Sequence, residues 1–324
     1  MRILITGANG FVGAALARHL STRGDEVRCL VRDGSDDSAL SGVTFTRVSG
    51  DVTRPRTLAA AVDGVDVVYH LAGTRRGSTR DDFMRVNAEG TRFVAEAMVA
   101  TKARRLVLVG SLAASGPSRS GHPRVETQPL APTEWYGESK AEAERIAFGF
   151  SSQLDVTCCR PSRILGPGDR ENLVFFRLAK RGLVLKLGGP PRRISMVDVD
   201  DAVDQLVLQG TRPEAVGETF FCSSHESLTL DGLMQQAADV LGVSARTVTV
   251  PEAVLPGLGA LADVASNVSG RKLPLSRKLA RQLLAPGWEC SIEKAQRLLG
   301  YRPRRAVADA LKRSAESYVH LGWL

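Results

Sequence analysis

The stretch TGANGFVG (6–13) decides the fold, because it joins a short apolar run to an amphipathic one. RILIT (2–6) has the composition of a buried β-strand, and the residues that follow the stretch carry apolar side chains at helical spacing. Gly7 permits a tight turn, Gly10 lets the backbone approach a pyrophosphate, and Gly13 lets the helix pack closely on the strand. The helix N-terminus then faces the phosphates with its partial positive charge, so this stretch predicts a dinucleotide site.

Outward from this turn, the first half of the chain alternates apolar runs with amphipathic stretches. Further strands are predicted at 26–31, 43–49, 66–73, 104–111 and 156–161. Because parallel neighbours need crossover helices, this order predicts an α/β fold, a Rossmann-type doubly wound parallel sheet.

The regularity fades after residue 165, where we place a domain boundary. Residues 1–165 are predicted to form the NAD(P)-binding Rossmann domain, and residues 166–324 a smaller, mostly helical substrate lobe. Residues 193–210 have the pattern of a strand followed by a helix, and 217–224 that of another strand. These segments near 193–222 are expected to return to the first domain.

Composition excludes several classes of protein. The 324 residues are 43% hydrophobic and 24% charged, which is typical of globular chains. The net charge is +8, but the basic residues are scattered as pairs, so nucleic acid is not an expected partner. No apolar run is long enough for a membrane span, and the phosphate turn leaves no room for a signal peptide.

Cysteine and histidine usage indicates neither disulfides nor metal. Five cysteines at irregular spacing include no CxxC, and the five histidines show no ligand pairing. We expect a reducing, cytoplasmic location and no metal site.

The end of the second strand bears on the choice of cofactor. NAD sites usually place an acid about 20 residues beyond the glycine turn, but here Val31 holds that place and Arg32 follows. Because an arginine can clamp a 2′-phosphate, NADP(H) is favoured. In the alternative, Arg32 stacks on adenine while Asp33 disfavours a phosphate, which leaves NAD(H) open. Asp51 and Val52, after the third strand, are candidates for contact with the adenine.

YGESK (136–140) is a candidate catalytic motif. Tyr136 and Lys140 are spaced to share one helix face, where the ammonium can sit beside both the phenol and a cofactor ribose. A nearby cation and an oxidised nicotinamide favour the phenolate, which suits Tyr136 to general acid–base work. Ser111 ends a predicted strand at the carboxyl edge of the sheet, where it can hold a substrate oxygen or cap a helix or turn.

The sequence strongly resembles the extended short-chain dehydrogenase/reductase family. The matching motifs are TGANGFVG (6–13), GDV (50–52), HLAG (70–73), VNAEGT (86–91), VGSLAASG (109–116), YGESK (136–140), RPSRILGPGD (160–169) and VDVDDAV (197–203). The resemblance implies a Rossmann lobe, a smaller substrate lobe and Ser–Tyr–Lys chemistry. Ser111 then matches the substrate-orienting serine, Tyr136 the acid/base and Lys140 the ribose-binding lysine.

The resemblance also implies further cofactor contacts. Phe11 and Val12 match pyrophosphate contacts, and Leu71, Ala72 and Gly73 match a segment that lines the cofactor. Pro161 falls beside the nicotinamide carboxamide, and Asn87 matches an asparagine that supports local backbone. Helices near 82–100 and 136–150 correspond to those that join dimeric relatives, so a homodimer is implied.

Within the family, RPSRILGPGD, GPSRSGHP (116–123) and Arg32 look most like the 3β-hydroxysteroid dehydrogenase and dihydroflavonol reductase-like branch. That branch interconverts hydroxyl and ketone groups of apolar or small substrates. We therefore expect an NAD(P)-dependent oxidoreductase that interconverts a secondary alcohol and a ketone.

Two alternatives stay open. The first is a nucleotide-sugar epimerase with tightly bound NAD. Many such enzymes carry an arginine where this chain has Ile194, although Arg192 and Arg193 precede it. Dehydratases often have acids after the catalytic serine, where Leu112 and Ala113 stand here. The second alternative is a non-catalytic nucleotide-sensing protein.

Overall fold

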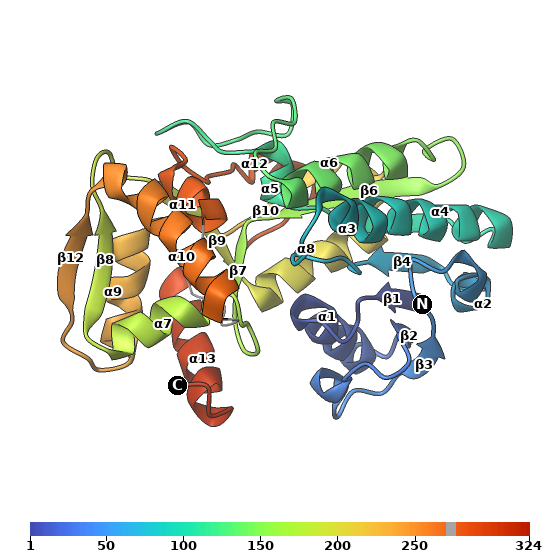
Figure 1. Cartoon of the computed structure of the whole chain (residues 1–324). Helices are drawn as coiled ribbons and strands as arrows, with labels where there is room; N and C mark the ends of the chain where they lie inside the picture. The colour runs from blue at the N-terminus through green and yellow to red at the C-terminus, as the bar shows by residue number, and fades with distance from the viewer. Residues whose placement is uncertain (270–276) are drawn as a thin grey trace.

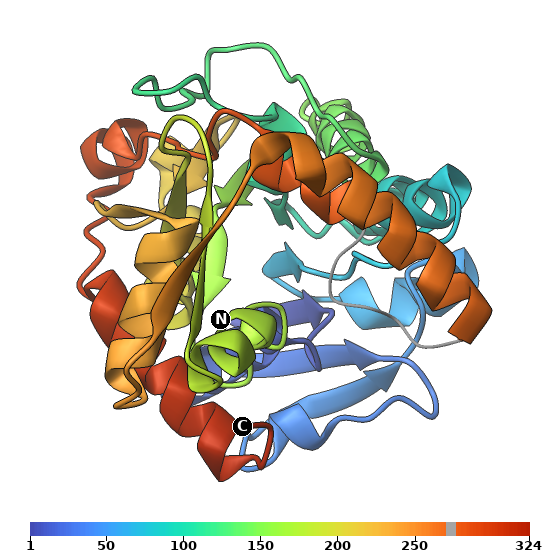
Figure 2. The ribbon, with the colours of Figure 1, turned by 60° about the vertical axis from the view of Figure 1, so that its left-hand side comes forward.

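The computed structural model describes residues 1–269 and 277–324, and its main feature is a parallel sheet with a second lobe beside it (Figures 1 and 2). The strands are β1 (Arg2–Thr6), β2 (Glu26–Val31), β3 (Thr46–Ser49), β4 (Val67–His70), β5 (Arg105–Val109), β6 (Asp155–Pro161), β7 (Arg163–Leu165), β8 (Leu183–Leu187), β9 (Arg193–Asp198), β10 (Thr219–Cys222), β11 (Ser227–Thr229) and β12 (Arg246–Val250).

The helices are α1 (Phe11–Thr22), α2 (Ala59–Val62), α3 (Arg80–Phe83), α4 (Gly90–Thr101), α5 (Leu112–Ser115), α6 (Trp135–Phe148), α7 (Leu173–Lys180), α8 (Val199–Thr211), α9 (Leu230–Val240), α10 (Leu255–Ser269), α11 (Arg277–Leu284), α12 (Glu293–Leu299) and α13 (Val307–His320). Shorter turns are η1 (Ser38–Leu40), η2 (Pro55–Thr57), η3 (Met84–Glu89, a π-helix), η4 (Pro213–Ala215) and η5 (Glu252–Val254).

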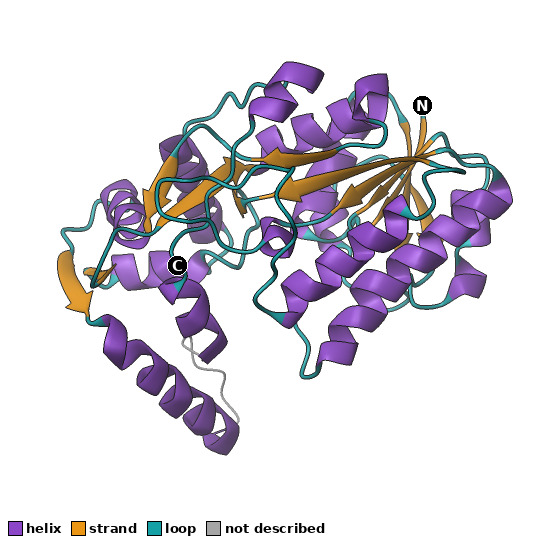
Figure 3. Cartoon of the chain, turned by 90° about the horizontal axis from the view of Figure 1, so that it is seen from above, coloured by secondary structure: helices purple, strands orange, loops and turns teal. Residues whose placement is uncertain are grey.

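Seven parallel strands form the main sheet in the order β10-β6-β5-β4-β1-β2-β3. Figure 3 shows this sheet between two layers of helices. β4 is buried along its whole length, as expected for a strand covered on both faces. The predicted doubly wound α/β fold is confirmed.

Each face of the sheet has its own apolar core. On one face, Leu16 of α1 and Leu206 of α8 pack with residues of β1 and β2. On the other face, Met98 of α4 and Ala143 of α6 pack with residues of β4 and β5. These contacts fix the N-termini of α1 and α6 near the carboxyl edge of the strands, where open α/β sheets bind ligands.

The second lobe is built around two small sheets and a third core. β11, β9 and β7 form one sheet and β12 pairs with β8 in the other. Phe176 of α7, Met234 of α9 and Leu311 of α13 are buried together in the core of this lobe. The chain also returns to the main sheet, because β10 pairs with β6. The boundary at residue 165 stays a prediction.

Three local expectations differ from the structure. The third strand begins at Thr46 rather than residue 43, because the Val43 amide bonds the Leu40 carbonyl in a turn. The fourth strand ends at His70, which leaves Leu71 to Gly73 irregular. The helical C-terminal part is present as expected, but it also contains the strands β8, β11 and β12, which were not predicted.

Candidate active site

A large cavity opens at the carboxyl edge of the main sheet, between this sheet and the second lobe. Its volume is about 1310 Å³, which leaves room for a dinucleotide and a substrate together. The cavity wall includes most of the predicted site residues: Gly7, Gly10, Phe11, Val12, Gly13, Leu71, Gly73, Ser111, Tyr136, Lys140 and Pro161.

The glycine turn has the shape of a phosphate cradle. Gly7 adopts a φ of +70°, and a Cβ there would lie 2.7 Å from the Ala72 amide nitrogen. A Cβ on Gly13 would lie 2.2 Å from the Gly7 carbonyl oxygen, so only glycine allows this approach of α1 to the turn. Gly10 caps α1, whose first turn has no acid and no capping side chain. The free amides of that turn therefore suit a pyrophosphate.

Ser111 lies just after β5 and is the N-cap of α5. Its Oγ accepts a hydrogen bond from the Ala113 amide at 3.1 Å, and the residue also borders the cavity. The capping role and the substrate role are therefore compatible. Because the oxygen accepts from Ala113, the hydroxyl proton is left to donate elsewhere.

α6 carries Tyr136 and Lys140 to the same cavity. The Lys140 side chain is buried, and its Nζ donates to the Val109 carbonyl at 2.8 Å. Its ammonium also lies against Gly73, where an added Cβ would be 3.3 Å from Nζ. The guanidinium of Arg75 lies over the Tyr136 ring, 5.5 Å from its centroid. The structure thus brings the three predicted catalytic residues to one cavity wall.

Asn87 supports this wall from behind. It lies in the π-helix η3 and is buried. Its Oδ1 accepts from the Thr74 amide at 2.7 Å, and its Nδ2 donates to Ser139 Oγ at 2.8 Å. These bonds fit the backbone-supporting role that the resemblance implies and tie the loop after β4 to α6.

His70 is a buried neutral histidine that the sequence did not single out. Thr91 Oγ1 donates its proton to the Asn87 carbonyl, so His70 Nε2 donates to Thr91 Oγ1 at 3.1 Å. His70 Nδ1 then accepts from Thr6 Oγ1 at 2.7 Å. Burial, aided by the charge of Lys140, lowers the pKa of His70 to about 3.

Several other predicted contacts lie off the cavity wall. Arg32 is exposed at the end of β2. The Asp51 carboxylate accepts from the amide and hydroxyl of Thr53, each at 2.8 Å. Val52 is buried in the core under α4, and Ala72 donates its amide to Thr6 Oγ1.

A buried ion pair backs the turn that carries Ser111. Arg160 donates from Nε and Nη2 to Glu144 Oε2 at 3.0 and 2.6 Å, and the two side chains are 7% and 3% exposed. Glu144 lies one helical turn after Lys140 and close to Gly110, where an added Cβ would be 2.5 Å from Oε1. The pair therefore joins α6, the end of β5 and the end of β6.

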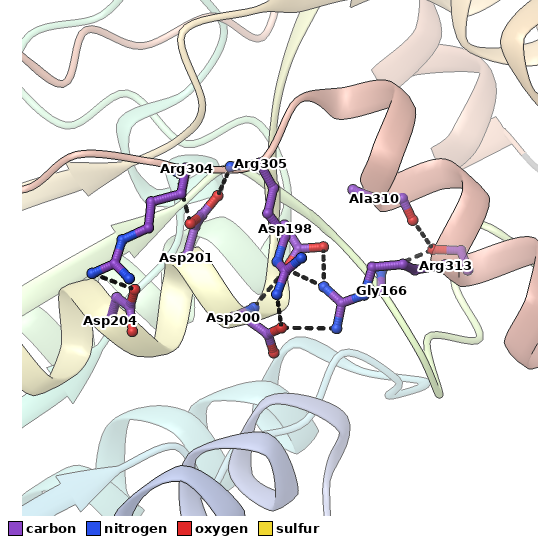
Figure 4. A network of polar contacts seen from close by, with 10 residues as sticks. Gly166, Asp198, Asp200, Asp201, Asp204, Arg304, Arg305, Ala310 and Arg313 are labelled. Atoms are coloured by element: carbon purple, nitrogen blue, oxygen red, sulfur yellow. Dashed lines mark hydrogen bonds and ion pairs between the residues drawn. The ribbon is translucent and has the colours of Figure 1, made fainter.

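The loop after β7 lies against the glycine turn and is held by α13. Gly166 and Gly168 donate their amides to Ser314 Oγ and Ser317 Oγ at 2.9 and 3.1 Å. Arg313 of the same helix binds the buried Asp198 carboxylate, with its Nη1 2.7 Å from Oδ2 (Figure 4). A Cβ on Gly166 would be 3.6 Å from the Phe11 ring. α13 thus fixes a loop that covers the start of α1.

Two further findings hold for residues 1–269 and 277–324. No group of three His, Cys, Asp or Glu side chains there is placed to bind a metal ion. No helix in this part of the chain combines the length and the apolar character needed to cross a membrane.

Sequence reasoning missed two arginines of the cavity, Arg75 and Arg163. The only signals were their positions: Arg75 is two residues after HLAG (70–73), and Arg163 directly follows RPS (160–162). Arg192 and Ile194 also border the cavity, whereas Arg193 binds Ser227 of the neighbouring strand β11.

Comparisons with known proteins identify the family of the chain and agree with its fold. Residues 3–221 match the family described as NAD dependent epimerase/dehydratase. The chain is 32% identical to a ceramide reductase of Caulobacter vibrioides, over 99% of this chain and 96% of that protein. It is 30% identical to a 2-alkyl-3-oxoalkanoate reductase of Stenotrophomonas maltophilia, over 97% and 98% of the two chains. The crystal structure of gox2253 superposes with a TM-score of 0.84 at 27% identity, covering 99% and 98% of the two chains.

Proposed function

The chain belongs to the NAD-dependent epimerase/dehydratase family and is an NAD(P)-dependent enzyme, and we propose that it interconverts a secondary alcohol and a ketone. One observation carries this proposal: Ser111, Tyr136 and Lys140 line the same cavity as the glycine turn. Two relatives that match nearly the whole chain are named as reductases, which supports a redox reaction.

The cavity offers a place for each part of the cofactor. The turn from Gly7 to Gly13 would hold the pyrophosphate, Lys140 the nicotinamide ribose, and Pro161 would lie beside the nicotinamide ring. When bound, the cofactor supplies or accepts the hydride.

The residues of the chain handle the proton and the oxygen. In the direction of reduction, Tyr136 Oη gives its proton to the ketone oxygen, and in oxidation the phenolate takes it back. Ser111 donates a hydrogen bond to the same oxygen, because its own oxygen already accepts from Ala113. Lys140, held by the Val109 carbonyl, keeps a positive charge near the phenol and stabilises the phenolate.

The corner after β2 supports NADP(H) as the favoured cofactor. Asp33, the acid that would repel a 2′-phosphate, accepts from Ser49 Oγ at 2.5 Å and lies 3.9 Å from the Arg47 guanidinium. Arg47 also donates to the Arg32 carbonyl, so two arginines gather at this corner. NADPH should therefore bind more tightly than NADH, and Arg32→Ala should reduce that difference. Equal affinities for the two cofactors would contradict the assignment.

The wall around β9 disfavours a sugar nucleotide. Ile194 borders the cavity at the position where many epimerases carry an arginine. Arg192 also borders the cavity, but its Nη2 is held by Glu252 at 2.8 Å. Arg193 does not border the cavity, and its Nε donates to Ser227 Oγ of β11 instead.

The test is the variant Tyr136→Phe, with two readouts. We expect turnover of secondary alcohols to fall by about 10²- to 10⁴-fold, because the acid–base group is lost. The affinity for NADPH, measured by fluorescence titration, should stay within about threefold. A fully active variant would refute the role of Tyr136. Stoichiometric cofactor retained through purification, with no net redox change, would point to an epimerase instead.

A further inference from the structure

Arg75 and Arg163 line the cavity near the proposed reacting centre. We propose that these two arginines bind a carboxylate of the substrate, so that the reacting compound is an oxo acid and its hydroxy acid rather than a neutral ketone. The inference rests on the proposed function and adds the class of substrate.

Arg75 lies at the reacting group itself. It belongs to the loop after β4, and its guanidinium is 5.5 Å from the centroid of the Tyr136 ring. A cation over an aromatic face is held there by the ring quadrupole, and its edge N–H groups stay free to donate. An anion bound by Arg75 therefore lies close to the oxygen that Tyr136 protonates.

Arg163 approaches from the opposite lobe on a rigid support. It is the first residue of β7, two positions after Pro161. Its Nη1 donates to Asn172 Oδ1 at 2.7 Å, and its guanidinium lies 5.6 Å from the centroid of the Phe175 ring. Asn172 is itself fixed by a bond from its Nδ2 to the Asp169 carboxylate at 2.5 Å. The guanidinium is thus preorganised by a neutral amide and an aromatic ring.

The acids of this loop bind other partners. Asp169 accepts from Asn172, from the Tyr318 hydroxyl at 3.1 Å and from the Glu171 amide at 2.7 Å. The Glu171 carboxylate is 3.6 Å from the Arg76 guanidinium. Their negative charges act on both arginines, but their hydrogen bonds and their ion pair go to other groups.

The two guanidiniums are also close enough to repel one another. Burial lowers the pKa of Arg163 and the positive charge of Arg75 lowers it further, while the charges of Asp169 and Glu171 partly oppose this shift. A carboxylate bound beside Arg163 would offset the cost of burying that cation, and its two oxygens match the guanidinium fork. The site has the charge and shape of a carboxylate clamp.

The position of the clamp limits the substrate. Because Arg75 packs on the ring whose hydroxyl meets the carbonyl oxygen, the carboxylate must be within a few bonds of the reacting carbon. Acids whose carbonyl carbon is that close to the carboxylate are 2-oxo and 3-oxo acids. The rest of the acid has an apolar wall formed by Leu187, Ile194, Leu230, Leu283 and Trp288.

The test compares an acid with its neutral ester in the direction of oxidation, since hydroxy acids do not lose CO₂. We would measure kcat/KM with NADP⁺ for both enantiomers of 2- and 3-hydroxydecanoate, for their methyl esters and for neutral secondary alcohols. Wild-type protein should prefer an acid to its ester by at least tenfold. Arg163→Met and Arg75→Met should each lower kcat/KM for that acid by about 10- to 100-fold, mainly through KM, and leave the ester within threefold.

Arg85→Met is the matched control, because it removes the same charge from an exposed site on η3 that does not border the cavity. It should leave both rates unchanged. Binding of NADP⁺ shows whether each variant is folded, and Arg163→Lys should recover part of the preference for the acid.

The failures can be told apart. If wild-type protein oxidises esters or neutral alcohols as well as acids, the clamp is refuted and the proposed function stands. Equal losses on acid and ester in both arginine variants would also refute the clamp. If wild-type protein binds NADP⁺ but oxidises no compound of the panel, the proposed function fails and the inference falls with it.

Discussion

Acidification should destabilise this protein through one side chain, His70. Its imidazole is 1% exposed and sits between the hydroxyls of Thr6 and Thr91. Nδ1 accepts a hydrogen bond from the Thr6 hydroxyl, so a proton added to Nδ1 would face the hydroxyl proton of Thr6. Burial, together with the charge of Lys140, moves the pKa of His70 on folding from 6.5 to about 3.

The direction and size of the effect follow from this pKa. Between pH 6.5 and pH 3 the unfolded chain holds a proton on this histidine that the folded chain does not, so the free energy of unfolding falls as the pH falls. The contribution is fully present above pH 6.5, and its loss is about 2 kcal/mol at pH 5. For a chain of 324 residues this corresponds to about 3 °C in Tm.

Urea unfolding of wild-type protein and His70→Asn at pH 7.5 and pH 5 measures this loss. Asparagine cannot take up the proton, so its loss of unfolding free energy between the two pH values should be about 2 kcal/mol smaller than that of the wild type. All other titrating groups are common to both proteins and cancel in the difference. His122→Asn, at an exposed position, should behave as the wild type does. If His70→Asn loses as much stability on acidification as the wild type, the reasoning is wrong.

Two further outcomes test the site. Gly13→Ala should weaken NADPH binding at least tenfold in a fluorescence titration, because the new Cβ would lie 2.2 Å from the Gly7 carbonyl and α1 must move. Gly257→Ala, with no atom within 4 Å of its Cβ, is the control, and equal affinities in the two variants would contradict the steric argument. Arg160→Met should cost about 3–5 kcal/mol in urea unfolding, since it leaves the Glu144 carboxylate buried and unpaired, and adding Glu144→Leu should restore most of the loss. If the double variant is as unstable as Arg160→Met alone, the loss of stability comes from packing and not from the unpaired charge of Glu144.

The parts of this site that rest on local sequence could be predicted. The strand, turn and helix around Gly7 and Gly13 follow from backbone sterics over a dozen residues, and the same holds for the spacing of Tyr136 and Lys140 on one helix. The order of strands and helices also predicted the doubly wound sheet, because crossover connections leave few topologies.

Features that depend on distant packing could not be predicted. From the sequence, Arg75 and Arg76 look like a solvent-exposed pair. The structure instead places the Arg75 guanidinium over the Tyr136 ring, at the cavity. The neutrality of His70 depends on Thr91, which reaches it from another element. β12, with the sequence RTVTV, lies in a segment of helical neighbours and becomes a strand by pairing with β8.

The pairing of β10 with β6 has a consequence for the order in which the chain is made. β6 ends at Pro161, but the strand that covers its outer edge is complete only at Cys222. During synthesis the first six strands of the sheet can therefore assemble while β6 still exposes a row of unpaired amides and carbonyls. A fragment that stops at residue 165 would lack β10 and would keep β6 as an unpaired edge strand. This edge of the sheet is thus covered late in translation, when β10 pairs with β6.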